Sequence, residues 1–559
     1  MLLMSNSAGS AVQVSLNRYF QQLRDQPDNQ TRESSSRMQL KRARDVRSTC
    51  PDLKSLLRAA AVHSAEKKMS TTQVPGPIPF NLIQATASVL RRIMKQCFYF
   101  VIAICIAVPP LPLTVAADLH ERKPNIIYVM LDDSGYGDFS AFGSQYVKTP
   151  VFDRLCAEGI KFTNHYSGSA VCAPTRCVLM TGLHTGHCRR RDNTAKAFIK
   201  ELSQKNGRPL VFLEDEDVTV AESLQQAGYY TAGIGKWGLG NPGSAGTPEK
   251  QGFDYWYGYL DQVHTHDHFP KEIWDAGEMV PVPGNSQGKK ETYIPYEQES
   301  KALRVISEHH DRPFFLYLAL TPPHGKYIIP ANDPAFAMYD GIPGGSQVQH
   351  YAAMITRADQ TVGKVIDLLK ELNIDDNTIV FYTSDNSPNP PFVKAIDSGA
   401  GLRGNKRLLY EGGICAAMAV RWPGKIKEAS SSEFIWDMRD VFPTLCDLAE
   451  IEPPSHLDGM SVLPTLLGKQ QQSQTMHYWE IHSPFQQAVR FGDWKGIRFG
   501  TEEPLELYNL KLDRSETENV AATTPEVTHK LETFLDAARS ESVYFPAKAK
   551  RAGRRKKNE

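Results

Sequence analysis

Continuous apolar runs, separated by stretches of helical periodicity, organise the chain from residue 123 onward. Residues 125–131, 313–320 and 377–383 are such runs, and each has the length of a strand buried on both faces of a parallel sheet. In the stretch 347–372 the apolar positions recur with the helical period instead. Strands and helices that alternate up to about residue 450 predict one large α/β domain.

The pattern changes after about residue 470. Short strand-like stretches at 487–490, 494–498 and 506–510 precede a helical stretch from about 524 to 539. We therefore expect a smaller subdomain of antiparallel sheet plus helix over residues 470–545, next to a main domain over residues 123–465.

The N-terminal part of the chain has a different composition. Residues 1–93 are rich in Arg, Ser, Gln and Asn, and a basic start, a short apolar run at 97–108 and the small residues 115–117 follow. This order is typical of a secretory signal peptide at 94–117, and the apolar run is too short for a transmembrane helix. The segment predicts a secreted or periplasmic protein without a stable membrane span.

A signal peptide so far from the first residue needs an explanation. Our interpretation is that Met94 is the true start and that residues 1–93 are a disordered extension or an error in the assignment of the gene start. The mature chain would then begin near Asp118. A genuine long N-terminal region or a membrane-anchored N-terminus is the alternative.

Charge is balanced over the whole chain. Lys plus Arg and Asp plus Glu each total 63, so nothing in the net charge predicts a nucleic-acid partner. The exception is the basic segment within residues 546–559. We expect it to be a solvated, disordered tail, and the alternative is an electrostatic tether to a polyanionic polysaccharide or a membrane surface.

Polar side chains follow the predicted strands at the points where they end. The residues at these four strand ends are Asp132, Asp133, Lys236, His324, Asp385 and Asn386. The carboxyl ends of strands in an α/β sheet are where such sheets place their ligands. Three carboxylates and an amide are hard oxygen ligands, which favour Ca²⁺ over Mg²⁺ and over zinc or iron.

The stretch 171–182 carries the most specific chemistry. Pro174 suits the first turn of a helix, which places Cys172 just ahead of the helix N-terminus, where free N–H groups favour negative charge. Arg176 lies one helical turn on and can reach the same site. A potential nucleophile in these surroundings suits a substrate with an anionic cluster of oxygens.

Cys-x-Pro-(Ser/Thr)-Arg, followed by Thr181 and Gly182, resembles the signature of the sulfatase family. The resemblance extends over residues 123–545 and implies an alkaline-phosphatase-like fold, a large mixed sheet sandwiched by helices. It implies that Cys172 is oxidised by a formylglycine-generating maturation enzyme. The hydrated aldehyde would then be the nucleophile that attacks a sulfate ester.

The resemblance also implies roles for the strand-end residues. Ca²⁺ would bind to Asp132, Asp133, Asp385 and Asn386, together with the modified Cys172. Arg176 would steady the nucleophile. Lys236 and Lys406, the latter shortly before Tyr-Glu-Gly-Gly, would contact the sulfate, and His324 would assist the leaving oxygen.

Two positions depart from the family pattern. The family often has Gly-Lys-Trp-His, and Gly238 stands at the place of that histidine. Either another residue, with His264 and His266 available, supplies its function, or turnover is altered. His264 is our candidate for a further substrate contact. Alternatively, the three alternating histidines of this stretch form a metal site or are surface residues of an edge strand. Cys415 stands where the family usually has Arg.

Cysteine usage sets a limit on disulfides. Nine cysteines occur, three of them before residue 118. Six cysteines follow residue 118, and modification of Cys172 would leave five. An odd number of thiols cannot pair completely within one chain. The chain has no Cys-x-x-Cys pair that would suggest zinc or redox chemistry.

These observations predict a sulfuric ester hydrolase. An exported enzyme with an aromatic, histidine-rich stretch suggests a sulfated carbohydrate, small or polymeric, as substrate. A phosphate or phosphonate ester hydrolase on the same scaffold is the first alternative. The second is a non-catalytic glycan-binding relative, which only Gly238 supports.

Overall fold

The computed structural model describes residues 122–195, 204–205 and 208–547. The predicted extension 1–93, the signal peptide 94–117 and the basic tail from Lys548 onward lie outside the described residues, so these interpretations stay predictions. Within the part that is described, no helix combines the length and the apolar character needed to cross a bilayer.

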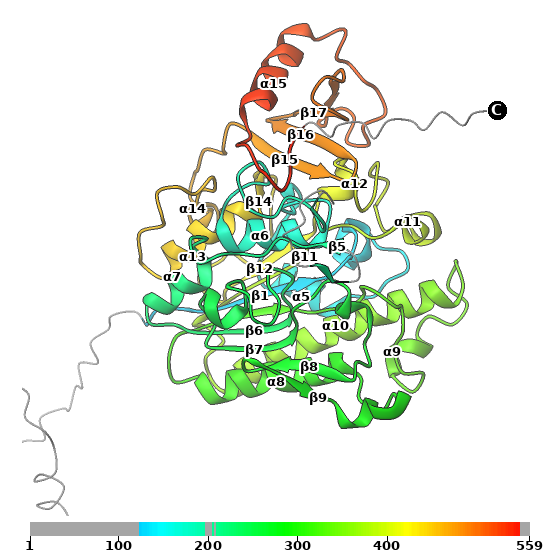
Figure 1. The fold of residues 1–559 in the computed structure, drawn as a ribbon, viewed down its shortest axis with the longest axis vertical. Helices are drawn as coiled ribbons and strands as arrows, with labels where there is room; N and C mark the ends of the chain where they lie inside the picture. The colour runs from blue at the N-terminus through cyan, green and yellow to red at the C-terminus, as the bar shows by residue number, and fades with distance from the viewer. Residues whose placement is uncertain (1–121, 196–203, 206–207, 548–559) are drawn as a thin grey trace, which may run out of the picture. The chain divides into compact units, whose positions relative to one another are not determined.

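A ten-stranded mixed sheet forms the centre of the main domain (Figure 1). Its strands are β1 (Asn125–Leu131), β2 (Ile160–Phe162), β6 (Tyr230–Lys236), β7 (Tyr255–Tyr259), β8 (Glu272–Asp275), β9 (Glu278–Pro281), β10 (Phe314–Ala319), β11 (Thr378–Ser384), β12 (Met418–Arg421) and β13 (Ser430–Ser432). Their spatial order is β13-β2-β12-β11-β1-β10-β6-β7-β8-β9. The five central strands from β11 to β7 are parallel, so their carboxyl ends meet at one edge.

Helices cover both faces of this sheet. They are α5 (Pro150–Ala157), α6 (Cys172–Thr181), α7 (Val220–Gln226), α8 (Ile294–His309), α9 (Pro334–Ala337), α10 (Ser346–Glu371), α11 (Pro390–Ile396), α12 (Glu411–Ile414), α13 (Val441–Leu448) and α14 (Leu463–Leu466). Ile127 and Val129 of β1 pack into the core that contains α5, α8 and α10. Tyr128 and Met130, which point to the other face, pack with α6, α7 and α13. The predicted sandwich is confirmed.

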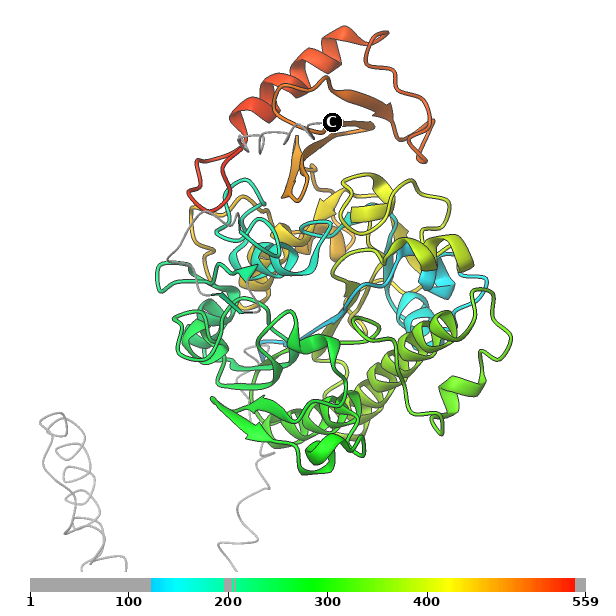
Figure 2. The same ribbon diagram turned by 45° about the vertical axis from the view of Figure 1, so that its right-hand side comes forward.

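The C-terminal part is an antiparallel sheet with a helix, as expected, and forms a lobe at one end of the described body (Figures 1 and 2). It contains β15 (His477–His482), β16 (Phe485–Phe491), β17 (Trp494–Arg498), β18 (Glu506–Asn509) and α15 (Pro525–Ala537). One face packs on α15 through a small core that includes Val489 and Leu531. The other face places Trp479 and Ile481 in the core of the main domain, so the lobe shares its packing with that domain.

Three local predictions need correction. The helix α6 begins at Cys172 itself, with Val171 as the extended residue before it. The alternating polar and apolar residues of 160–166 are typical of a single strand, but the stretch is divided into β2 and the short β3 (His165–Tyr166), which pairs with β14 (Trp436–Asp437). Residues 411–414 are the helix α12, because the glycines there press closely against residues 403–408: a Cβ on Gly413 would lie 1.8 Å from the Leu408 carbonyl oxygen.

Candidate active site

The strand-end residues converge as the sequence predicts. Asp132 and Asp133 follow β1, and the backbone N–H of Asp133 donates to Asp385 Oδ1 after β11, at 3.0 Å. The Asn386 amide donates to Asp133 Oδ1 at 2.7 Å. All four side chains are buried. Neighbouring parallel strands thus bring residues from two distant parts of the chain into one oxygen-rich cluster.

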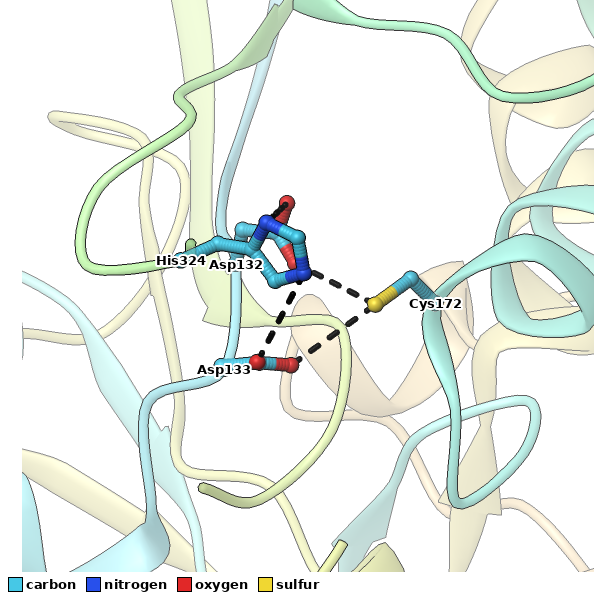
Figure 3. Close-up of side chains that lie close together, drawn as sticks. All are labelled: Asp132, Asp133, Cys172 and His324. Atoms are coloured by element: carbon cyan, nitrogen blue, oxygen red, sulfur yellow. Dashed lines mark hydrogen bonds and ion pairs between the residues drawn. The ribbon is translucent and has the colours of Figure 1, made fainter. Parts of the chain in front are cut away.

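Cys172, the first residue of α6, faces this cluster from one side (Figure 3). Its sulfur is 3.3 Å from Asp132 Oδ1 and 3.6 Å from Asp133 Oδ1, and the thiol is fully buried. Burial, followed by the charges of Asp132 and Asp385, raises the pKa of the thiol well above 9. The unmodified side chain is therefore a neutral thiol and a poor nucleophile.

The helix start beside Cys172 is less open than the sequence suggested. The N–H of Ala173 donates to Asn193 Oδ1 at 3.0 Å, and Thr175 contacts the Val171 carbonyl through both its N–H and its hydroxyl. Asn193 therefore occupies one of the donors that we had assigned to an anionic group.

Three cations surround the carboxylates. Arg176 donates to Asp385 at 2.8 Å and to the Lys236 carbonyl at 2.7 Å, and its guanidinium is fully buried. Lys236 Nζ lies 2.7 Å from Asp132 Oδ2. Lys406 pairs with Asp133, and its Nζ is 3.5 Å from the Cys172 sulfur. Each cation thus neutralises one of the three carboxylates.

The carboxylates respond differently to this environment. Burial opposes the ionisation of Asp132, but Lys236 and Arg176 outweigh it and lower its pKa to about 2. For Asp385, burial and the nearby Asp132 charge raise the pKa to about 7. A third ionised carboxylate in this space therefore calls for additional positive charge.

The donor set fits a calcium ion. Asn386 Oδ1 is a buried acceptor without a hydrogen-bond partner among the described residues, and it adjoins the carboxylates of Asp132, Asp133 and Asp385. Carboxylate and amide oxygens are the ligands that Ca²⁺ prefers, and a dication would offset the repulsion that raises the Asp385 pKa.

His324 lies on the cavity side of the same cluster. Its ring nitrogens are 3.9 Å from Asp132 and 3.8 Å from Asp133. Burial, followed by the charge of Lys236, lowers its pKa well below 6.5, so the ring is neutral in the metal-free protein. The buried His268 hydrogen-bonds to the His324 carbonyl at 2.8 Å and thereby fixes the loop after β10.

A cavity of about 500 Å³ opens over the cluster. Asp133, His324 and Lys406 lie among its lining residues. The lining also includes Asp192, Asn193, Asp261, Gln262, His266, Tyr327, Asn389 and Arg407. Of these eight, only His266 was a candidate from the sequence. The others were missed because their positions depend on the packing of the whole domain; among them only Asn389 and Arg407 have a signal, their closeness in sequence to Asn386 and Lys406.

The three alternating histidines have different surroundings. His264 borders a separate hollow of about 250 Å³, together with Asn241 and Glu272. His266 lines the main cavity, with its ring centroid 4.7 Å from that of His324. His268 is buried behind the loop. The structure does not gather them into a metal cluster, and it places His266, not His264, beside the predicted site.

A helix-covered mixed sheet with hydrolytic groups at its strand ends defines the class of alkaline-phosphatase-like ester hydrolases. Residues 124–451 match the family model described as Sulfatase, and residues 403–541 match the model described as N-sulphoglucosamine sulphohydrolase, C-terminal. The chain therefore belongs to the sulfatase family and is a sulfuric ester hydrolase. The match favours this class over both alternatives weighed from the sequence.

Relatives span most of the described chain. The N-acetylgalactosamine-6-O-sulfatase of Bacteroides thetaiotaomicron is 29% identical over 508 residues, which cover 75% of this chain and 94% of that protein. Arylsulfatase A of Homo sapiens is 30% identical over 487 residues, covering 76% and 91%.

Solved structures show the same fold. Ps i-CgsB in complex with a neocarrahexaose superposes with a TM-score of 0.63 at 24% identity, covering 74% of this chain and 93% of that one. A 6S-sulfatase from the glycosaminoglycan metabolism of Bacteroides thetaiotaomicron gives 0.62 at 26% identity, covering 75% and 99%.

Proposed function

We propose that the protein hydrolyses sulfate esters of carbohydrates, with a formylglycine made from Cys172 as nucleophile and Ca²⁺ as cofactor. The observation that carries this proposal is the position of the Cys172 sulfur, within 3.6 Å of two carboxylates and of Lys406 at 3.5 Å, beneath a cavity of about 500 Å³. The raised pKa of the Cys172 thiol supports this proposal, because a neutral thiol is a poor nucleophile and its conversion to a hydrated aldehyde would provide a reactive hydroxyl.

The carbohydrate substrate is supported by the cavity wall and by the relatives. Asp192, Asp261 and Asn389 provide acceptors and donors of the kind that bind sugar hydroxyls. Two relatives are named for N-acetylgalactosamine 6-sulfate and glycosaminoglycan chemistry. A cavity of this size suits one or two sugar units, which favours a sulfated sugar at the end of a chain.

The reaction is proposed to proceed from residue 172. One hydroxyl of its hydrate attacks sulfur and the sugar oxygen leaves; the second hydroxyl then loses its proton, sulfate departs and the aldehyde returns. Lys236 and Lys406 hold the sulfate oxygens, and Arg176 fixes Asp385 beside the nucleophile. Lys236 gives a proton to the sugar oxygen, or His324 does so once it has itself taken up a proton in the presence of the anionic substrate.

Asp132, Asp133, Asp385, Asn386 and residue 172 would hold the calcium ion. When bound, Ca²⁺ supplies positive charge that stabilises the negative charge developing on the sulfate oxygens.

Mass spectrometry of the peptide that contains residue 172 tests the nucleophile. We expect an aldehyde or its hydrate in protein made with a formylglycine-generating enzyme, and an unmodified cysteine in the same wild-type chain made without that enzyme. An intact thiol in a host that modifies a known sulfatase under the same conditions would exclude this nucleophile.

Export is a separate proposal, which the signal-like segment 94–117 supports. N-terminal sequencing of material secreted by the native host should give a start near Asp118. Retention of residues before Met94 in that material would exclude both the cleavage and the proposed start.

A further inference from the structure

The side chain of Gln262 stands in the space that a side chain at position 238 would need. Gly238 has a φ of +84°, and a Cβ built on it would lie 2.0 Å from Gln262 Nε2 and 3.7 Å from Arg176 Cδ. The glycine is held there by its N–H, which donates to the Leu260 carbonyl at 3.0 Å, and by its own carbonyl, which accepts from Arg190 at 2.8 Å. Gln262 thus occupies the space beside Arg176 that a side chain at position 238 would fill.

Gln262 also lines the cavity that contains Asp133, His324 and Lys406. Its position is fixed by the neighbouring Asp261, whose Oδ1 accepts from the N–H groups of Val263 at 2.7 Å and His264 at 3.0 Å. Two hydrogen bonds within the turn thus help to position Gln262 at the cavity wall.

The amide of Gln262 has a buried donor without an acceptor. Its Nε2 is shielded from solvent and has no hydrogen-bond partner among the described residues. A buried donor without a partner is costly, and such groups in native proteins usually have a partner, which here a bound molecule would provide. Gln262 lines the same cavity as Lys406, a proposed sulfate contact, which makes an anionic oxygen the expected acceptor.

We propose that Gln262 binds the substrate of this sulfatase, donating a hydrogen bond from its side-chain amide to a sulfate oxygen. The inference rests on the proposed function and names a residue that no sequence motif singles out. In this proposal Gln262, and not His264 or His266, takes the role of the histidine that the family often has at position 238.

Substitution of Gln262 tests the contact in the formylglycine-containing, calcium-loaded enzyme. With a small aryl sulfate, Gln262→Ala should lower kcat/KM about 10- to 100-fold, the range for a lost hydrogen bond to a charged group. Gln262→Glu has nearly the same shape and should lower it further, because a carboxylate repels sulfate. In each variant, inhibition by inorganic sulfate should weaken by about the same factor as kcat/KM falls. The melting temperatures of both variants should equal that of wild type.

A double-mutant cycle tests the link to position 238. Gly238→Ala should displace the Gln262 amide and reproduce the loss seen in Gln262→Ala, and the combined variant should be little worse than either alone. Gly243→Ala is the matched control, since Gly243 has a φ of +87° with open space around its Cβ position. It should show the effect of backbone strain alone.

The outcomes separate the two proposals. If modified wild-type enzyme hydrolyses no sulfate ester, the proposed function fails and this inference with it. If wild type is active and Gln262→Glu matches it in kcat/KM and in sulfate inhibition, only the role of Gln262 is overturned. A loss confined to sulfated sugars, with aryl sulfate and inorganic sulfate unaffected, would likewise overturn the sulfate contact.

Discussion

Asp133 shows how the site constrains a single residue. Its φ of +71° lies in the left-handed region, which costs a residue other than glycine about 1–2 kcal/mol. The conformation is held by the hydrogen bond from its N–H to Asp385 and by the Tyr351 hydroxyl, which donates to its carbonyl at 3.2 Å. This conformation directs the Asp133 carboxylate toward Lys406 and Cys172. The free-energy cost of the strained backbone is therefore a consequence of the geometry that the site requires.

Arg176 should be essential for stability as well as for activity. Its removal in Arg176→Ala leaves Asp385 and Asp132 buried without this cation, and breaking a buried ion pair costs about 3–5 kcal/mol. Denaturant unfolding should show this loss. Arg176→Lys keeps the charge but loses the guanidinium group that donates to both Asp385 and the Lys236 carbonyl. It should therefore be more stable than Arg176→Ala and still have a low activity.

The matched control is Arg304→Ala, which removes an exposed arginine 3.8 Å from Glu308. Its effect on unfolding should stay below about 1 kcal/mol. Equal stabilities of Arg176→Ala and Arg304→Ala would contradict the buried network described here.

Calcium should stabilise the folded protein measurably. Chelation should lower the melting temperature and the activity, and added Ca²⁺ at about 100 times its dissociation constant should restore about 2.7 kcal/mol. Asn386→Ala removes the buried amide oxygen and should shift the calcium titration of the melting temperature to higher concentration. Asp311→Asn, at an exposed position, is the control, and its melting temperature should depend on calcium concentration as that of wild type does. A melting temperature that changes neither with chelator nor with added calcium would contradict the metal site.

At the level of elements, α7 should depend on its first residue. Thr219 accepts a hydrogen bond from the Glu222 N–H and Glu222 reaches back to the Thr219 N–H, and together they form a capping box. The Thr219 hydroxyl also donates to the Gln251 carbonyl at 2.8 Å. Thr219→Ala should therefore cost about 1–2 kcal/mol in denaturant unfolding.

The control for this substitution is Thr533→Ala. Thr533 is an exposed threonine within α15, and its hydroxyl only returns to the carbonyl of His529. Its replacement should change stability by less than about 0.5 kcal/mol. A cost for Thr219→Ala no larger than this would mean that the cap adds nothing to α7.

Elements that are buried on both faces were predictable, and turns were not. The runs of β1, β10 and β11 and the period of α10 match the structure because burial alone selects their residues. Since Asp133 and Asp385 follow such strands, the cluster could be predicted with them. The turn η6 (His264–His266) could not, because its direction depends on Asp261 and on the packing of the neighbouring loop, so the positions of Gln262 and His266 stayed hidden.

At the scale of the whole molecule, the C-terminal lobe is joined to the main domain by a buried polar network. Glu480 of β15 accepts from Arg539 at 2.9 Å and from Arg191, near the cavity wall, at 3.3 Å. The Tyr478 hydroxyl and the His482 ring also contact the carboxylate, at 2.7 and 2.9 Å. One side chain thus links the end of α15, the small sheet and the segment that leads to Asp192.

This network makes the stability of the molecule sensitive to acid. Burial opposes the ionisation of Glu480, but His482 and Arg539 outweigh it and lower its pKa from 4.5 to about 2. A carboxylate with a lowered folded-state pKa stabilises the protein above its unfolded pKa and loses that effect as the pH falls. The contribution, about 3 kcal/mol, should be complete above pH 4.5 and decline between pH 4.5 and 2.

Comparison with Glu480→Gln isolates this contribution from other titrating groups. At pH 7 the variant leaves Arg191 and Arg539 without their buried anion and should be about 3–5 kcal/mol less stable than wild type in urea unfolding. The gap should shrink as the pH is lowered from 5 to 3, because the unfolded chain takes up a proton at Glu480 near pH 4.5 while the folded carboxylate is still ionised. Glu518→Gln, at an exposed position, should show no gap at either pH. A gap that stays constant from pH 7 to 3 would contradict the lowered pKa of Glu480. The absence of a gap at every pH would show that the lobe is held by apolar packing alone, through Trp479 and Ile481.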